Sequence, residues 1–472
     1  MYRRAVLCVV LGMVVAGCSS PSSKKSFTPS TEGKKLLHFG SPAYQEMLNN
    51  IDEVEQVAFD GLIIGGAMVM QKPFAEPEKM YDFADKMAKV PFKRYTDNFY
   101  LCYNFPGSTP ADFDWFDDNS WIDENWRIAA RVAKRAGFKG ICFDTEYYEG
   151  LPLFGYWQAR HHDTKSFEEY QAQCRKRGAE IMKAVSEEYP DITIILLFGY
   201  SGSYFGVPQH ARSSANNYTL VSSFVDGMLT ECKEGATIHD MHEQSFSFRR
   251  PGSFERTRAM MKSRMLEKTV VPEAYKKHHR AGFSFWADCW ENASQGRAFN
   301  VDDFEINYYT PDEFAYAIHH ALGYSDKYVW MWPGVFNWWK KTARTGDVDG
   351  EKVYKPLPPE YLEGLERAHA ASLPEPPRDR KQNTYRNLEA KTQQGFDDES
   401  TFKDLWETHE FIADLPVQWK FSLDWDEIGV KKGWYRPCFD DSDWATVEIR
   451  EFWEVQGFSP YDGQAWYRLN YA

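Results

Sequence analysis

From residue 36 onward, short apolar runs alternate with amphipathic stretches of helical length. Apolar runs without strict polar alternation are typical of strands that are buried on both faces of a parallel sheet. The pattern predicts eight strands, over residues 36–39, 58–64, 99–104, 138–144, 192–197, 225–230, 282–287 and 328–332.

Helix boundaries fall between these runs. The segments at 120–123, 166–169 and 310–313 resemble helix capping boxes, and a last helix is expected over 358–371. Repeated strand-then-helix units predict a (β/α)8 TIM barrel over residues 35–372, in the α/β class. An open doubly wound sheet is the alternative, but no strand is followed by the glycine-rich phosphate loop of that fold.

The chain changes character after the predicted barrel. Residues 373–416 are polar and are expected to form a linker or strap, and residues 417–472 an all-β segment. The stretches FDDSDW at 439–444, FWE at 452–454 and YDGQAWYR at 461–468 resemble the opening strands of the sugar-binding jelly roll of family 2 glycoside hydrolases. The segment is too short for eight strands, so we expect a partial sheet.

The N-terminus has the layout of an export signal, with Arg3 and Arg4 before an apolar run that is too short to span a membrane. The tetrad VAGC ending at Cys18 resembles the lipobox of bacterial lipoproteins. It implies a signal peptide over 1–17, lipidation of Cys18, a tether over 18–34, and a membrane-anchored protein facing the periplasm or cell surface, with the outer membrane as the expected site. An ordinary secretory signal with an incidental Cys18 is the alternative.

The formal net charge is −14, and it becomes about −16 once residues 1–17, which hold two arginines and no acid, are removed. A nucleic-acid surface needs the opposite sign, so such a partner is not expected. The cysteines outside the signal show no zinc-ligand spacing, and we expect no metal and no cofactor.

The run GICFDTEYYEG at 140–150 ends the predicted fourth strand. In such barrels the chemistry lies at the carboxyl ends of the strands. Side chains two apart on a strand share a face, so Cys142, Asp144 and Glu146 are expected to point into the barrel mouth.

Further acids follow other predicted strands, with Glu231 after the sixth and Asp288 and Glu291 after the seventh. Glycoside hydrolysis needs two carboxyl groups, one that protonates the leaving oxygen and one that attacks or activates water. We expect Glu146 to be the general acid/base, Asp144 to tune its pKa or orient substrate, and Asp288 or Glu291 to be the second carboxylate.

Aromatic residues make up 16% of the chain and gather after the predicted strands, where they can stack on sugars. His239 opens the segment HDMHE, which is interpreted as a polar loop near the mouth that contacts sugar hydroxyls. The residues expected to bind substrate are Tyr147, Tyr200, Glu231, His239, Trp290, Trp330 and Trp332.

The fourth-strand run is similar to the D-G-x-D-x-D-x-E motif of family 18 chitinases, with Gly140, Asp144 and Glu146 at matching positions and Lys139 and Cys142 in place of the first two aspartates. That resemblance implies that Glu146 is the acid and that Asp144 orients the substrate. The broader group of barrel glycosidases would instead pair Glu146 with Asp288 or Glu291.

These features predict an exported, lipid-anchored glycoside hydrolase that acts on a poly- or oligosaccharide. A surface lipoprotein that binds carbohydrate on a catalytically inactive barrel is the alternative. The two differ in whether the barrel releases reducing ends from the glycan that it binds.

Overall fold

The computed structural model describes residues 27–103, 113–148, 150–202, 217–289, 298–348, 350–372, 376–377, 418–426, 428–436, 438–449, 453–458 and 464–469. The predicted signal peptide, Cys18, Trp290 and Glu291 lie outside these residues, as does nearly all of the predicted linker. The chain divides into two units, of which residues 26–375 with 454–461 form the larger.

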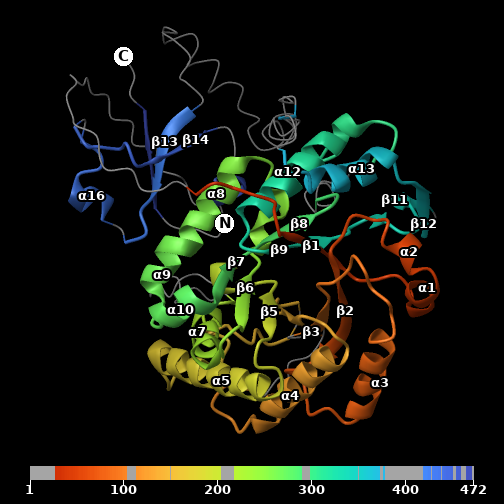
Figure 1. Ribbon diagram of the computed structural model, residues 1–472. Coiled ribbons are helices and arrows are strands. Elements are labelled where there is room, and N and C mark those ends of the chain that lie inside the picture. Colours follow the sequence, from red (N-terminus) through yellow and green to blue (C-terminus); the bar gives the residue numbers. More distant parts are fainter. Residues whose placement is uncertain are drawn as a thin grey trace. The chain divides into compact units, whose positions relative to one another are not determined.

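The larger unit is a (β/α)8 barrel (Figure 1). Its parallel strands are β1 (Lys35–Phe39), β2 (Gly61–Met68), β3 (Phe99–Tyr103), β4 (Gly140–Asp144), β5 (Thr193–Leu196), β6 (Thr237–Asp240), β7 (His279–Ala281), β8 (Phe283–Trp286) and β9 (Tyr328–Trp332). β7 pairs with β6 and β8 pairs with β9, and only Gly282 separates β7 from β8. Together β7 and β8 form the seventh strand, which closes the barrel.

A ring of helices surrounds the strands (Figure 1). The helices are α1 (Tyr44–Asn49), α2 (Ile51–Val54), α3 (Pro77–Met87), α4 (Ser120–Arg135), α5 (Phe167–Glu188), α7 (Val221–Glu231), α8 (Pro251–Ala259), α9 (Met265–Lys268), α10 (Pro272–His278), α12 (Pro311–Tyr324) and α13 (Pro359–Ala368). The capping boxes predicted at the starts of α5 and α12 are confirmed. The one predicted at Ser120 is wrong, because Asn119 is the N-cap residue and makes no side-chain capping bond.

The barrel interior is packed with apolar side chains, which come from alternate positions along the strands and from residues directly after them. It comprises Leu37, Ile63, Phe99, Leu101, Cys142, Ile195, Leu197, Met241, Tyr328 and Trp330. Their inward parity in β4 and β6 also sets which side chains reach the mouth above them.

The predicted sixth strand at 225–230 is wrong, since these residues lie in α7. α7 packs against α5 so closely that a Cβ on Gly178 would lie 2.1 Å from the Phe224 carbonyl oxygen, and one on Gly227 would lie 1.9 Å from the Arg175 carbonyl oxygen. The helix is buried along most of its length, and a short stretch of a buried helix cannot be told from a buried strand by its apolar run. The sixth strand is β6, which begins at Thr237, twelve residues after the predicted start.

Residues 27–34, predicted as the end of a free tether, lie against the barrel. The Thr31 hydroxyl donates to the Ala370 carbonyl at 3.1 Å, and the Lys34 ammonium donates to the carbonyls of Ser325 and Asp326 at 2.7 and 2.9 Å. Ser325 and Asp326 precede β9, so the N-terminal segment reaches the barrel at the end where the strands begin.

Two small antiparallel sheets accompany the barrel. In the larger unit, β10 (Phe336–Asn337), β11 (Thr342–Val348) and β12 (Glu351–Pro356) follow the eighth strand and were not predicted. In the smaller unit, β13 (Gln418–Leu423) pairs with β14 (Ala445–Glu448) and β15 (Ala465–Arg468), a short sheet as the sequence predicts, and α16 (Gly429–Lys432) follows β13.

A short segment near the C-terminus, Glu454–Phe458, belongs to the barrel unit and lies on α8. The Arg256 guanidinium donates through Nε to the Gln456 carbonyl at 2.7 Å and lies over the Phe458 ring at 5.1 Å. Gly457 has a φ of 88°, and a Cβ there would lie 2.6 Å from the Ser253 carbonyl oxygen. The close approach to the helix therefore requires glycine.

Candidate active site

The end of β4 carries a carboxylate whose two oxygens are both hydrogen-bonded. Asp144 is only 2% exposed. Its Oδ1 accepts the backbone N–H of Glu146 at 2.9 Å, and its Oδ2 accepts the Tyr148 hydroxyl at 3.0 Å. Burial, with a further contribution from the Glu146 charge, raises the pKa of Asp144 to about 7.

Glu146 stands beside Asp144 in the segment that leaves β4, as the sequence predicts. Its side chain is partly exposed, and burial raises its pKa above the ordinary value, although an interaction with the Tyr148 hydroxyl opposes the rise. The segment is fixed on both sides of Glu146. The Thr145 hydroxyl donates to the Phe198 carbonyl, and the Tyr147 N–H donates to the Tyr218 hydroxyl at 2.8 Å.

A third carboxyl group, that of Glu243, reaches the same place from the sixth strand. His239 and Met241 face the barrel interior, and Glu243 follows at the next alternate position, at the start of the short helix η2 (Glu243–Ser247). Burial together with the charges of Glu146 and Asp144 raises the pKa of Glu243 well above its ordinary value. The mouth therefore gathers the carboxyl groups of Asp144, Glu146 and Glu243.

Sequence reasoning missed Glu243 as a mouth acid, although the motif that contains it was singled out. Because residues 225–230 were assigned to the sixth strand, the HDMHE segment was placed in a loop after it. The position of HDMHE could have identified the strand. It follows α7 and a short turn, and in a β-then-α repeat the segment after a helix is expected to be a strand.

Like charges in one partly buried site disfavour one another's ionised form. The protons of the three carboxyl groups come off in coupled steps that belong to the group as a whole. Raised pKa values favour the protonated form of a carboxyl group, and general acid catalysis with a carboxylate partner requires one protonated and one ionised group in the same site.

His242, directly before Glu243, has an unusual backbone conformation with φ 22°. Its buried ring bonds through Nδ1 to the Ser201 hydroxyl at 3.0 Å, and that hydroxyl donates to Asp240 Oδ1 at 2.7 Å. Because the Ser201 hydroxyl donates its hydrogen to Asp240, its oxygen accepts the hydrogen bond from His242. Nδ1 is therefore the protonated nitrogen of the His242 ring. The His242 carbonyl accepts the hydroxyls of Ser245 and Ser284 at 2.8 and 3.0 Å, so the turn that presents Glu243 is held from both sides.

Aromatic side chains form a wall at the same mouth. Trp332 lies 5.0 Å from Phe39 and 6.3 Å from Trp286, measured between ring centroids. Phe246, three residues after Glu243, lies 5.4 Å from both Trp286 and Trp330. Trp332 is partly exposed and Trp330 is buried beneath it, so of the two predicted tryptophans only Trp332 has a ring surface open to solvent.

Asp288 follows the seventh strand, as predicted, and is buried. Its Oδ1 accepts the Trp286 indole N–H at 2.8 Å. Burial raises its pKa, and Arg344 is the charged neighbour that lowers it. Gly334, with φ 58°, leaves no room for a Cβ, which would lie 1.7 Å from Asp288 Oδ1. Asp288 thus holds the Trp286 ring, a role that does not depend on its acting as a catalytic carboxylate.

Three predicted site residues lie away from the mouth. Glu231 is the last residue of α7 and not the end of a strand, so its predicted placement is wrong. His239 is a buried residue of β6 whose ring packs against Tyr328 at 4.8 Å, not a loop residue. Tyr200 is buried against Tyr275 and His279, between the sheet and the helices. Because His239 and Tyr200 are buried, neither can contact a sugar. Glu231 is partly exposed, but it lies at the end of a helix and not at the end of a strand.

The described residues contain no group of three or more side chains suited to hold a metal ion. No helix among them is long and apolar enough to cross a bilayer.

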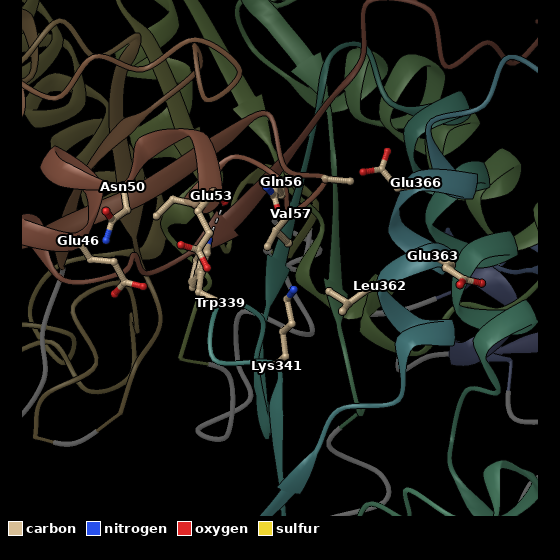
Figure 2. A pocket seen from close by; sticks show the side chains of 12 residues that line it. Glu46, Asn50, Glu53, Gln56, Val57, Trp339, Lys341, Leu362, Glu363 and Glu366 are labelled. Carbon is tan, nitrogen blue, oxygen red and sulfur yellow. Dashed lines mark hydrogen bonds between the residues drawn. The ribbon is translucent and has the colours of Figure 1, made fainter.

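A separate pocket of about 260 Å³ lies outside the mouth, and none of the predicted site residues lines it. Figure 2 shows Glu46 and Glu53 on one side of Lys341, and Glu363 and Glu366 on the other. Trp339 closes part of it and donates its indole N–H to the Val54 carbonyl at 3.2 Å.

The raised carboxyl pKa values and the aromatic wall point to the barrel mouth as the candidate active site.

The fold and site define a (β/α)8 barrel whose C-terminal mouth is acidic and partly walled by aromatic rings. No protein-family model and no curated protein matches the chain.

Among solved structures, the chain is similar to a thermostable mutant of a xylanase from Cellvibrio japonicus, at 9% identity and a TM-score of 0.39, covering 72% of this chain and 98% of the xylanase. It is also similar to a GH18 chitinase from Flavobacterium johnsoniae (11%, 0.34, 71% and 94%) and to a GH5 endoglucanase from an uncultured bacterium (10%, 0.36, 73% and 96%). These neighbours are glycoside hydrolases, but at such scores the likeness does not decide the activity of this chain.

Proposed function

We propose that the protein is an exported, lipid-anchored glycoside hydrolase that acts on a poly- or oligosaccharide, with Glu146 as the general acid/base. The convergence of Asp144, Glu146 and Glu243 at the mouth carries this proposal. Each of the three has a raised pKa, and the aromatic wall begins three residues after Glu243.

Glu146 is suited to protonate the leaving oxygen, because it is the most solvent-facing group of the pair that ends β4 and its pKa is raised. Glu243 is preferred to Asp288 as the second carboxylate, because the Glu146 charge raises the pKa of Glu243, whereas Asp288 holds the Trp286 ring. Glu291 lies outside the described residues and stays a candidate. It would attack the sugar or activate a water, depending on its distance from Glu146 in the substrate complex. Asp144 sets the orientation of Glu146 through the 2.9 Å hydrogen bond to its backbone.

A screen for reducing-sugar release across polysaccharides, with wild type, Glu146→Gln and Glu243→Gln, tests this function. Each variant is expected to lose activity by about 100-fold or more while keeping its fold. Glu231→Gln is the matched control, because it makes the same change at the end of α7 and is expected to keep full activity.

Full activity in Glu146→Gln would refute its role. Glycan binding by the wild type without any release of reducing ends would instead favour the non-catalytic carbohydrate-binding alternative. The lipid anchor is tested separately, by metabolic labelling with a fatty acid that wild type incorporates and Cys18→Ser does not.

A further inference from the structure

The first described residues of the chain and the candidate active site lie at opposite ends of the barrel. We propose that the anchored protein faces its membrane with the end of the barrel where the strands begin, so that the mouth opens away from the bilayer toward glycans in the aqueous phase. This inference rests on the proposed lipid anchoring at Cys18 and on the proposed activity at the mouth.

The first observation is where the N-terminal segment lies. The Ser30 N–H donates to the Gly323 carbonyl at 3.3 Å, at the end of α12. The Lys34 ammonium binds the carbonyls of Ser325 and Asp326, and the Lys35 N–H donates to the Lys327 carbonyl at 2.8 Å. Residues 30–35 are thus fixed to the loop that enters β9. This loop lies at the end of the barrel where the strands begin, and we call that end the barrel base.

Phe27 extends this attachment toward the anchor. Its ring packs on Tyr324 at 5.9 Å and lies under the Arg258 guanidinium at 4.0 Å. Arg258 is itself bound to the base, since it donates to the Tyr324 carbonyl at 2.8 Å and pairs with Asp326 at 2.7 Å. Phe27, the first described residue, therefore also lies at the barrel base.

The second observation is length. Eight residues, 19–26, separate the lipidation site from Phe27, and the chain from Cys18 to Phe27 spans at most about 30 Å when fully extended. A compact unit of roughly 350 residues has a radius of gyration of about 20 Å and hence a width of about 50 Å. A tether shorter than the barrel unit cannot let the opposite end of that unit reach the bilayer that holds the anchor.

The charge of the mouth also favours the orientation in which the mouth faces away from the bilayer. The mouth gathers three carboxyl groups, and the negative surface of an anionic bilayer repels their ionised forms. The substrate class is accordingly a soluble or extracellular glycan that arrives from the aqueous side, and not a sugar headgroup of the anchoring membrane.

The orientation can be measured without any activity. The lipidated protein is bound to vesicles of phosphatidylethanolamine with a minor share of phosphatidylglycerol and an acceptor-labelled lipid. A donor dye is placed by Lys139→Cys in the loop that enters β4, or by Asp302→Cys in the loop that follows the seventh strand, both exposed and both in a Cys438→Ser background. Cys102, Cys142, Cys174 and Cys289 are buried, and burial raises the pKa of the Cys232 thiol to about 12, so these cysteines react slowly.

Energy transfer to the bilayer is expected to be several-fold higher from position 139 than from position 302. Equal transfer, or stronger transfer from position 302, would overturn the orientation. A protein that does not bind vesicles at all, like the Cys18→Ser control, would overturn the anchor and the orientation with it. Neither result depends on hydrolysis, so a failure of the proposed activity is recognised separately in the reducing-sugar screen.

Discussion

The carboxylate of Asp144 accepts the backbone N–H of Glu146 at 2.9 Å, so the two acids that end the fourth strand are linked through one short turn. The backbone at Glu146 cannot move away without breaking a bond to a buried carboxylate. The pair therefore acts as one unit in its response to pH and to mutation.

The ionisation of Asp144 is expected to lower stability as the pH rises. Its pKa is about 7 in the folded protein and 3.8 ordinarily, so the protonated form stabilises the fold below pH 4, and this contribution is lost as the pH rises through 7. The full difference is on the order of 4 kcal/mol. Asp144→Asn should gain on wild type in free energy of unfolding between pH 4 and pH 8, as denaturant titrations at each pH will measure. A difference that stays constant over that range would contradict this.

Removing the Ser201 hydroxyl should destabilise the turn before Glu243. Ser201→Ala leaves the buried Asp240 carboxylate and the His242 ring without their shared partner, at a cost of about 1–3 kcal/mol. Ser263→Ala, which removes an exposed hydroxyl bonded only to the Ala259 carbonyl, should stay within about 0.5 kcal/mol of wild type. Equal effects of the two changes on urea denaturation would show that the buried network contributes little.

Gly334→Ala should be more harmful than another alanine substitution at positive φ. The new Cβ collides with Asp288 and must displace it, and with it the Trp286 ring, so we expect a loss of about 3 kcal/mol and a changed tryptophan fluorescence spectrum. Gly137→Ala has a φ of 73° with nothing within 4 Å of the Cβ, so it isolates the backbone cost of about 1 kcal/mol. If the two variants unfold at the same temperature, the contact with Asp288 is not rigid.

Gly227→Ala should destabilise the protein, although alanine normally favours a helix by about 1 kcal/mol. Its Cβ would lie 1.9 Å from the Arg175 carbonyl oxygen and would force α7 away from α5. Gly252→Ala in the first turn of α8 places its Cβ 2.9 Å from the end of the Arg256 side chain and not against backbone, so it should cost less than Gly227→Ala. Calorimetry will compare the two, and a stabilised Gly227→Ala would mean that the helices separate at little cost.

The sequence was most informative where local and long-range constraints agree. The fourth strand was placed correctly, and so was Asp144 at its end, because an apolar run there ends in acids and follows a well-formed helix. The sixth strand was misplaced because α7 is buried almost all round and is richer in apolar residues than β6 itself. β6 consists of Thr237, Ile238, His239 and Asp240, and of its polar residues His239 and Asp240 are buried by the barrel as a whole.

The same error hid Glu243, since its role depends on which strand precedes it. Tyr200 was assigned to the mouth because it follows the fifth strand, but the chain turns there into a short 3-10 helix that faces α10. A strand end locates the mouth only to within a few residues, and the direction of each later side chain is decided by packing between distant segments.

The segment Glu454–Phe458 on α8 has a consequence for dissecting the molecule. The chain leaves the barrel unit after residue 375 and returns to it at residue 454, so the small sheet is formed by residues inserted between two parts of the barrel unit and by those that follow. A chain ended at residue 375 would lose the partner of Arg256 and uncover the face of α8 around Ser253. Ending the chain after Phe458 keeps this contact, whereas a boundary chosen where the barrel pattern stops does not.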